Sequence, residues 1–265
     1  ALSCVKLLIG IPTGGSPAKP FLESLSALRL PDEARSVDRI TVSGNFIPAQ
    51  RELMLKRAQD TNADVLAMID DDMVLPSDAI VKLWEILERN PRCALAGALY
   101  YTRDGLRPMA VDDWDERRTT SAHTPAFDDR TPVEVDGVGF GCVLLRVSAL
   151  SVLSEPFIRT QIFIEEHANR VRVCNEDYLF CASLRSKGLT VTLHPGVRCG
   201  HYDRASGRTF PETWEPAHLT NHRRMAVMHA DGTQALEAFD ERVPQTQERH
   251  VAAALEYIYT DERLR

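Results

Sequence analysis

No apolar run in this 265-residue sequence reaches the roughly 18 residues that cross a bilayer, and no signal-peptide pattern opens it. Basic residues are not in excess either, because 31 Lys and Arg stand against 38 Asp and Glu, for a net charge of -7. Proteins that bind nucleic acid without sequence preference are usually basic. These absences argue against a membrane-spanning protein and against a non-specific nucleic-acid binder.

Paired cysteines are also missing. The six cysteines are scattered, none forms a C-x-x-C pair, and several lie within apolar runs. Zinc sites and disulfide frameworks need closely spaced or paired cysteines. We therefore expect free, mostly buried thiols and a protein of the reducing cytoplasm.

What the sequence does have is the composition of a globular chain, 44% hydrophobic and 26% charged. Apolar runs and helical spacings alternate through its first hundred residues. This alternation predicts an α/β fold with a mostly parallel, Rossmann-like sheet and flanking helices. In order we expect strand 5–11, helix 21–30, strand 40–42, helix 48–59, strand 65–69, helix 77–90 and strand 93–100.

The later segments continue this pattern less regularly. Residues 154–173 fit no element, and the polar segment 102–132 is interpreted as a long surface excursion, either a variable loop or a lid. Residues 1–215 then form one domain, and the charged tail 216–265 is predicted to be helical and to pack on the core or mediate homo-oligomerisation. The remaining expected elements are strands 133–138, 142–147 and 190–193, a short helix at 148–153 and a helix from about 175 to 187.

The most informative segment is Val65–Val74, an apolar run that leads into three consecutive carboxylates, Asp70, Asp71 and Asp72. An unpaired charge is too costly to bury, so the strand must surface at Asp70, at the carboxyl end of the sheet, where α/β proteins bind ligands. If the chain stays extended there, Asp70 and Asp72 point to one side and Asp71 to the other. Two converging carboxylates favour a hard divalent cation, Mn²⁺ or Mg²⁺. The alternative is that the acids only begin the next helix, for which one carboxylate would suffice.

Two pairs of later residues each have a functional and an ordinary structural interpretation. His201 follows Gly200 just past a predicted strand and can complete a metal site, with His194 as the second choice. Taken alone, His201 is an ordinary loop histidine. Glu176 and Asp177 begin a predicted helix, where acids suit the helix dipole, and the functional alternative is a general base in a cleft.

Two earlier segments leave a similar choice open. Pro12, Thr13 and Gly14 begin a loop of small residues whose backbone N–H groups can approach a ligand, although the loop lacks the spacing of a Walker loop or a G-x-G-x-x-G turn. Arg51 and Lys56 lie on the helix before the acidic strand. Local physics favours solvated charges there, and the alternative is that Arg51 faces a bound nucleotide.

Together these segments resemble the GT-A fold glycosyltransferases, in particular their broad family-2-like group. Asp70–Asp72 is similar to the D-x-D signature of that family, Asn175–Phe180 to its E-D motif, and Gly200–His201 to its late metal-binding histidine. Asp136–Arg146 resembles the glycine-containing part of its acceptor and sugar site. The resemblance covers roughly residues 3–205, and the Q-x-x-R-W motif of processive polysaccharide synthases is absent from the sequence.

The resemblance implies a hexosyltransferase-like enzyme that uses a UDP- or GDP-linked sugar donor and inverts the anomeric centre. In that scheme Asp70, Asp72 and His201 hold Mn²⁺ or Mg²⁺, and Asp177 is the catalytic base with Glu176 beside it. The donor-binding residues that it implies are Pro12, Thr13, Gly14, Arg51, Asp70, Asp71, Gly139 and Gly141.

Two other functions stay open. Asp70-x-Asp72-x-Val74 fits the nucleophile motif of haloacid-dehalogenase-type phosphatases and phosphotransferases, in which Asp70 would be phosphorylated and Asp72 would be the general acid. That motif normally lies on the first strand of the chain, whereas here at least one strand precedes it. The other alternative is a nucleotide-sugar-binding module without turnover. The sequence leaves the sugar, the base and the acceptor open.

Overall fold

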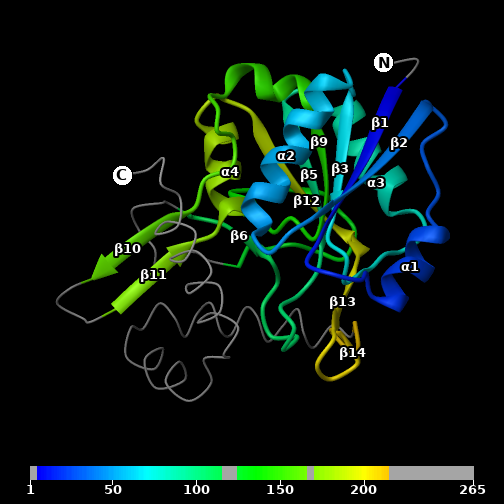
Figure 1. Ribbon diagram of the computed structural model, residues 1–265, viewed down its shortest axis with the longest axis vertical. Coiled ribbons are helices and arrows are strands. Elements are labelled where there is room, and N and C mark those ends of the chain that lie inside the picture. The colour runs from blue at the N-terminus through cyan, green and yellow to red at the C-terminus, as the bar shows by residue number, and fades with distance from the viewer. Residues whose placement is uncertain (1–4, 115–123, 166–169, 215–265) are drawn as a thin grey trace. The chain divides into compact units, whose positions relative to one another are not determined.

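A computed structural model describes residues 5–114, 124–165 and 170–214 (Figure 1). The chain divides into two units, residues 1–214 and 215–265, and all the described residues belong to the first unit. The predicted helical tail therefore lies outside the described residues, and its role in packing or oligomerisation stays a prediction.

The described residues form a central seven-stranded sheet in the order β2-β1-β3-β9-β5-β12-β7. Strands β2, β1, β3, β5 and β12 run in one direction, and β9 and β7 run against them. This arrangement confirms the predicted α/β fold with a mostly parallel sheet. The strands are β1 (Val5–Thr13), β2 (Ala34–Ser43), β3 (Val65–Ile69), β5 (Cys93–Leu99), β7 (Val133–Val135), β9 (Cys142–Arg146) and β12 (Thr190–Arg198).

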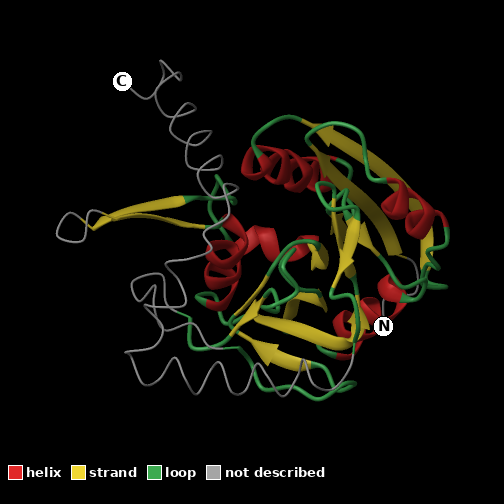
Figure 2. Ribbon diagram, turned by 90° about the horizontal axis from the view of Figure 1, so that it is seen from below, coloured by secondary structure: helices red, strands yellow, loops and turns green. Residues whose placement is uncertain are grey.

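Helices cover both faces of this sheet, as the red ribbons in Figure 2 show. In the central strand β3, Leu66 and Met68 belong to the core under α2, whereas Ala67 belongs to the core under α3. Because successive side chains of a strand point to opposite faces, a strand covered on both faces has no polar positions. The first face carries α2 (Ile47–Asp60), α4 (Glu176–Arg185) and the 3-10 helix η1 (Val147–Val152), and the second carries α1 (Lys19–Ser26) and α3 (Ala79–Arg89).

The described residues also form smaller sheets outside the main sheet. In one of them His201 pairs with Met73, the residue directly after the three carboxylates. Backbone pairing between two distant segments thus places the predicted histidine beside the acidic residues. These sheets consist of β4 (Met73–Val74), β13 (Gly200–Asp203) and β14 (Arg208–Phe210), of β6 (Ala110–Val111) and β8 (Gly137–Val138), and of β10 (Gln161–Glu165) and β11 (Arg170–Cys174).

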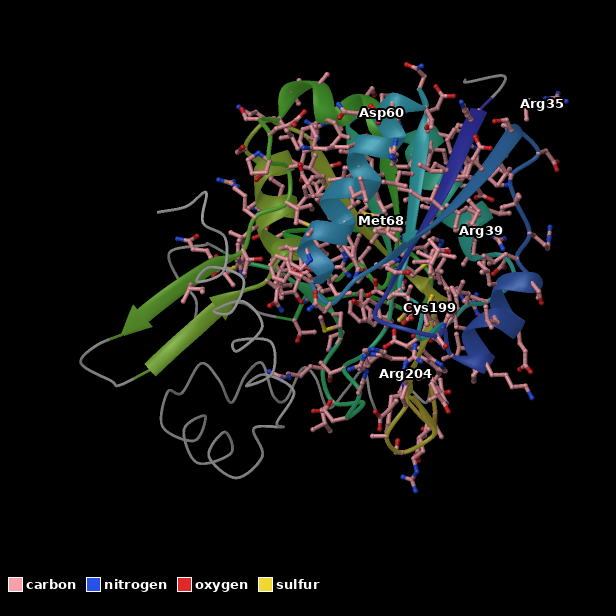
Figure 3. The ribbon with its side chains drawn as sticks, in the orientation of Figure 1. Arg35, Arg39, Asp60, Met68, Cys199 and Arg204 are labelled. Carbon is pink, nitrogen blue, oxygen red and sulfur yellow. The ribbon has the colours of Figure 1, made fainter. Side chains whose placement is uncertain are left out.

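Several predicted strand limits are wrong. Strand β2 begins at Ala34 rather than at residue 40. The prediction missed its first residues because β2 is an edge strand whose side chains are mostly exposed. The charged side chains of its first part include Arg35 and Arg39, which Figure 3 labels, so residues 34–39 have no apolar signature. Charged residues on an edge strand also oppose pairing with other chains.

Other differences arise from pairing that no local pattern signals. The predicted strand 133–138 is two strands, β7 and β8, which pair with β12 and β6. Strand β12 extends to Arg198 rather than ending at residue 193, and the loop expected after it contains β13. Residues 154–173, which fitted no element, contain β10 and most of β11. Within the described ranges, no helix combines the length and the apolar character that crossing a membrane requires.

Candidate active site

The predicted site residues gather where β3 ends, and the three carboxylates there lie in a turn. The Met73 N–H donates to the Asp70 carbonyl at 3.2 Å, and the Asp70 N–H donates to the Gly141 carbonyl at 3.0 Å. The expectation of an extended chain with alternating carboxylates is therefore wrong. Because the chain turns, each carboxylate meets a different basic partner.

Asp70 is held by Arg51 from the first half of α2. Arg51 Nη2 lies 3.0 Å from both carboxylate oxygens of Asp70, and its Nη1 donates to Glu176 Oε1. The guanidinium is buried and lies over the ring of Phe140, 5.3 Å from its centroid. Burial alone would lower the pKa of Arg51, but the charges of Asp70 and Glu176 raise it well above its ordinary value. The expectation of a solvated Arg51 is thus wrong, and we find it joining two candidate site residues.

Asp71 faces the loop that follows β1. Its carboxylate accepts a hydrogen bond from Thr13 Oγ1 at 2.5 Å and pairs with Arg204 Nη2 at 2.9 Å. Arg204 also donates to the carbonyl of Ser16 at 2.6 Å, and Figure 3 shows it beside β13. Two of the predicted donor-binding residues, Thr13 and Asp71, are therefore in direct contact.

The rest of the predicted loop divides between core and surface. Pro12 is a buried residue of β1, whereas Gly14 is exposed in the loop that follows. The nearest atom to a Cβ built on Gly14, apart from its chain neighbours, is the Gly44 carbonyl oxygen at 3.7 Å. The backbone of Gly14 is thus accessible, whereas Pro12 is buried near the end of the strand.

Asp72 and His201 form a pair of candidate metal ligands. His201 Nε2 lies 3.5 Å from Asp72 Oδ2, and His201 Nδ1 lies 2.8 Å from the carbonyl oxygen of Tyr101. A carbonyl oxygen only accepts, so Nδ1 carries a proton and donates it to Tyr101, which leaves Nε2 as the ring nitrogen that faces Asp72. Metal-bound histidines are oriented by this kind of second hydrogen bond.

The same oxygen of Asp72 also pairs with Arg103 Nη2. Burial would raise the pKa of Asp72, but the hydrogen bond with His201 and the charges of His201 and Arg103 outweigh it and lower the pKa to about 2. Asp72 is therefore a carboxylate throughout the neutral range. It is the carboxylate that the structure places beside the histidine.

A divalent cation fits this arrangement as a partly protein-bound ion. Asp72 and His201 supply one oxygen and one nitrogen donor, a set that suits Mn²⁺ as well as Mg²⁺. Both oxygens of Asp70, the third predicted ligand, lie 3.0 Å from Arg51 Nη2, and its role as a metal ligand stays a prediction. Among the described residues, no three His, Cys, Asp or Glu side chains are grouped to hold a metal by themselves. The remaining ligands would come from a bound diphosphate and water, which is usual for Mg²⁺ sites.

Asp177 and Glu176 lie in the first turn of α4, and both are buried. Asp177 Oδ1 accepts the N–H of Tyr178 at 2.8 Å, while Glu176 is paired with Arg51. Burial and the adjacent charge of Glu176 raise the pKa of Asp177 to about 7. A carboxyl group with that pKa exchanges a proton readily near neutral pH, which is what a general base requires.

The two glycines predicted to bind the donor have a packing role. A Cβ on Gly139 would lie 2.2 Å from the Tyr100 hydroxyl oxygen, and one on Gly141 would lie 2.8 Å from Tyr100 Cζ. The Gly141 N–H also lies 3.1 Å from that hydroxyl. Both positions must therefore be glycine for Tyr100 to pack beside the acidic turn, and their contact with a donor stays a prediction.

His194, the second choice for the metal site, and Lys56, expected to be solvated, both have partners other than these carboxylates. His194 accepts the N–H of Gly196 at 3.2 Å, and burial together with the charge of Lys82 on α3 lowers its pKa. Lys56 pairs with Glu155 at 3.2 Å. The structure thus brings together Arg51, Asp70, Asp72, Glu176, Asp177 and His201, and links Asp71 to Thr13.

Sequence reasoning missed Arg103 and Arg204. Arg103 follows the predicted strand 93–100, and Arg204 lies in the loop predicted after strand 190–193, three residues past His201. A signal was available, because basic residues at that edge suit a site with three carboxylates. Arg103 was counted only as part of a surface excursion, residues 115–123 of which lie outside the described residues.

Comparison with known proteins gives a fold but no family. No family model matches the sequence, and no curated protein does. Among solved structures, A197 from STIV matches with a TM-score of 0.55 and 16% identity over 79% of this chain and 95% of its own. The glycosyltransferase GalNAc-T7, solved with UDP, GalNAc and Mn²⁺, matches with a TM-score of 0.52 and 13% identity over 83% of this chain and 48% of its own.

The chain has a GT-A-type fold. At these identities the likeness extends to the fold alone, because one fold carries many activities. It agrees with the mostly parallel sheet and with ligand binding at the carboxyl ends of its strands. The GT-A-type fold is therefore consistent with a ligand site at the acidic turn.

Proposed function

We propose that this protein is a metal-dependent glycosyltransferase that moves a sugar from a nucleotide diphosphate donor, UDP- or GDP-linked, to an acceptor. The observation that carries the proposal is the pairing of Asp72 with a histidine whose Nδ1 is committed to the Tyr101 carbonyl. In a GT-A-type fold this pair lies at the strand ends where a donor diphosphate would bind.

Each candidate residue has a distinct part in the proposed reaction. Asp72 and His201 would hold Mn²⁺ or Mg²⁺, which supplies positive charge to the leaving diphosphate. Arg51 fixes the carboxylates of Asp70 and Glu176, so the site is ordered before the substrate arrives.

Asp177 would act as the base of an inverting displacement. It accepts the proton of an acceptor hydroxyl or amine as that atom attacks the anomeric carbon. The bond between the anomeric carbon and the diphosphate oxygen breaks at the same time, and its electron pair leaves with the diphosphate. Because attack comes from the side opposite the leaving group, the anomeric configuration inverts.

The geometry does not favour the phosphatase alternative. A phospho-aspartate mechanism needs Asp70 as the nucleophile, and hydrogen bonds from the charged Arg51 Nη2 to both its oxygens make that carboxylate a weaker nucleophile. A nucleotide-sugar-binding module would keep the same site without turnover. Release of a nucleoside diphosphate from the donor, measured with and without an acceptor pool, separates the enzyme from the module.

The first test is thermal melting against UDP, GDP and their sugar conjugates, with Mn²⁺ and with EDTA. A ligand at a hundredfold excess over its dissociation constant stabilises the folded protein by about 2.7 kcal/mol. For a domain of this size we expect a shift of roughly 5–10 °C with one nucleotide family, and its loss with EDTA. A shift with Mg²⁺ and beryllium fluoride but with no nucleotide would instead indicate a phospho-aspartate enzyme.

The raised pKa of Asp177 predicts the pH dependence of the reaction. The base must be ionised, so kcat/KM at saturating Mn²⁺ should rise about tenfold per pH unit below an apparent pKa near 7 and level off above it. A carboxyl at its ordinary pKa of about 3.9 would give a flat profile across this range. A flat profile between about pH 5.5 and 7.5 would remove Asp177 from the role of base.

A further inference from the structure

Arg103 contacts the oxygen on which the proposed metal site depends. It pairs with Asp72 Oδ2, the atom that His201 Nε2 approaches to 3.5 Å. A guanidinium and a divalent cation would both be attracted to this oxygen by its charge. Because one carboxylate oxygen offers limited space, close binding of one cation opposes close binding of the other.

The backbone that carries Arg103 is firmly placed. The Thr102 N–H donates to the Arg107 carbonyl at 2.9 Å, and the Gly105 N–H donates to the Thr102 carbonyl at 2.7 Å. Gly105 adopts a φ of +71°, which a side chain would disfavour, and it packs against Phe210 of β14. The closed loop 102–107 therefore fixes the Cα of Arg103, and the long side chain is left as the movable part.

The same short segment also orients the histidine. The carbonyl that receives His201 Nδ1–H belongs to Tyr101, two residues before Arg103. Tyr101 is bridged to Pro108, which closes the base of the loop. One segment thus both aims a metal ligand at Asp72 and supplies a positive charge to the same carboxylate.

Resting on the proposed function, we infer that Arg103 occupies Asp72 before the cation binds and then binds the donor diphosphate. When a cation takes Asp72 Oδ2, the half-exposed guanidinium is displaced but stays anchored at the edge of the site. Its planar fork suits phosphate oxygens, which the same cation brings to this place. Arg103 would then share with the cation the negative charge of the leaving diphosphate.

Arg103→Ala should change two affinities in opposite directions. Mn²⁺ alone, titrated by calorimetry without nucleotide, should bind about three- to tenfold more tightly, because a competing cation of partial exposure has been removed. UDP or GDP at saturating Mn²⁺ should bind about ten- to a hundredfold more weakly, because charge-assisted hydrogen bonds to phosphate are lost. A loop that only supported the fold would weaken both ligands or neither.

Arg204→Ala is the matched control for the Mn²⁺ titration. Both arginine side chains are 47% exposed and pair with one carboxylate of the acidic turn, but Arg204 pairs with Asp71 rather than Asp72. Its removal should leave the affinity for Mn²⁺ alone within about twofold. Arg103→Lys keeps the charge, so its affinity for Mn²⁺ should stay near that of the parent protein. Its affinity for the nucleoside diphosphate should be lower, because lysine lacks the planar fork of arginine.

The outcomes separate this inference from the proposed function. If the parent protein binds Mn²⁺ and a nucleoside diphosphate while Arg103→Ala leaves both affinities unchanged, the role of Arg103 is wrong and the glycosyltransferase proposal stands. Equal weakening of both ligands by Arg103→Ala also overturns it. If the parent binds neither Mn²⁺ nor any nucleotide, both proposals fail.

Discussion

Asp177→Asn is expected to lower the turnover of the protein by about 10²–10⁴-fold, the contribution typical of a general base. The substitution keeps the size of the side chain, and Asn Oδ1 can still accept the Tyr178 N–H that Asp177 receives at 2.8 Å. Binding of the donor with Mn²⁺ should therefore change by no more than about twofold, as calorimetry would show, because Asp177 is not among the proposed metal ligands.

The control for this experiment is Asp60→Asn. Asp60 ends α2 with a 65% exposed side chain, and Figure 3 shows it near the top of the described residues, well away from Arg204. It makes the same chemical change without touching the site, so turnover should stay at the parent level. Normal turnover in Asp177→Asn, or a product that retains the anomeric configuration, would show that Asp177 is not the base of an inverting reaction.

Arg51→Met should destabilise the fold by about 3–5 kcal/mol, because it removes a buried guanidinium that pairs with both Asp70 and Glu176 and leaves their charge uncompensated. The midpoint of thermal unfolding should fall by roughly 6–20 °C. Methionine fills a similar volume, so the cavity contribution is small. The free energy of unfolding, measured by denaturant titration, tests the expectation directly.

The pH dependence identifies the cause of this loss. Burial raises the pKa of Asp70 and the charge of Arg51 opposes that rise, so without Arg51 the folded-state pKa of Asp70 should lie further above its unfolded value. Stability from such groups is present at low pH and is lost as pH rises through the folded pKa. The difference in the free energy of unfolding between Arg51→Met and the parent should therefore shrink as the pH falls from about 8 to about 5.

Arg57→Met is the matched control on the same helix. Arg57 is 58% exposed and lies 3.6 Å from Asp60, an exposed pair that contributes little. Its stability should stay within about 0.5 kcal/mol of the parent. A loss in Arg51→Met that does not exceed that of Arg57→Met would mean that the buried ion pairs do not matter for folding.

The central strands show which parts of the fold can be predicted from the sequence alone. Val65–Ile69 is apolar at every position because both faces of β3 are covered, and such a run can be recognised without knowing its neighbours. The first part of strand β2, residues 34–39, was not predicted, because its exposed edge position gives it no apolar pattern. The pairing of β13 with β4 depends on residues more than a hundred positions apart, which no local window contains.

The candidate site divides in the same way. The cluster of three carboxylates, the acids at the start of α4 and the histidine after Gly200 were all visible as residue types in suggestive positions. Their partners were not visible, because an arginine on a helix has the same local sequence whether it is solvated or buried. Local sequence favoured a solvated Arg51 although the family resemblance implied a donor-binding one, and the fold buries it between Asp70 and Glu176.

The sequence by itself determined that an α/β sheet presents a group of carboxylates at its carboxyl edge, since apolar periodicity and the cost of burying charge are local properties. Only the tertiary structure decided which basic side chain each carboxylate contacts. Arg51 pairs with Asp70 and Arg204 pairs with Asp71, whereas Arg103 and His201 both contact Asp72. Ion pairing depends on distance in space, and the turn after β3 and the strand pairs around it set those distances.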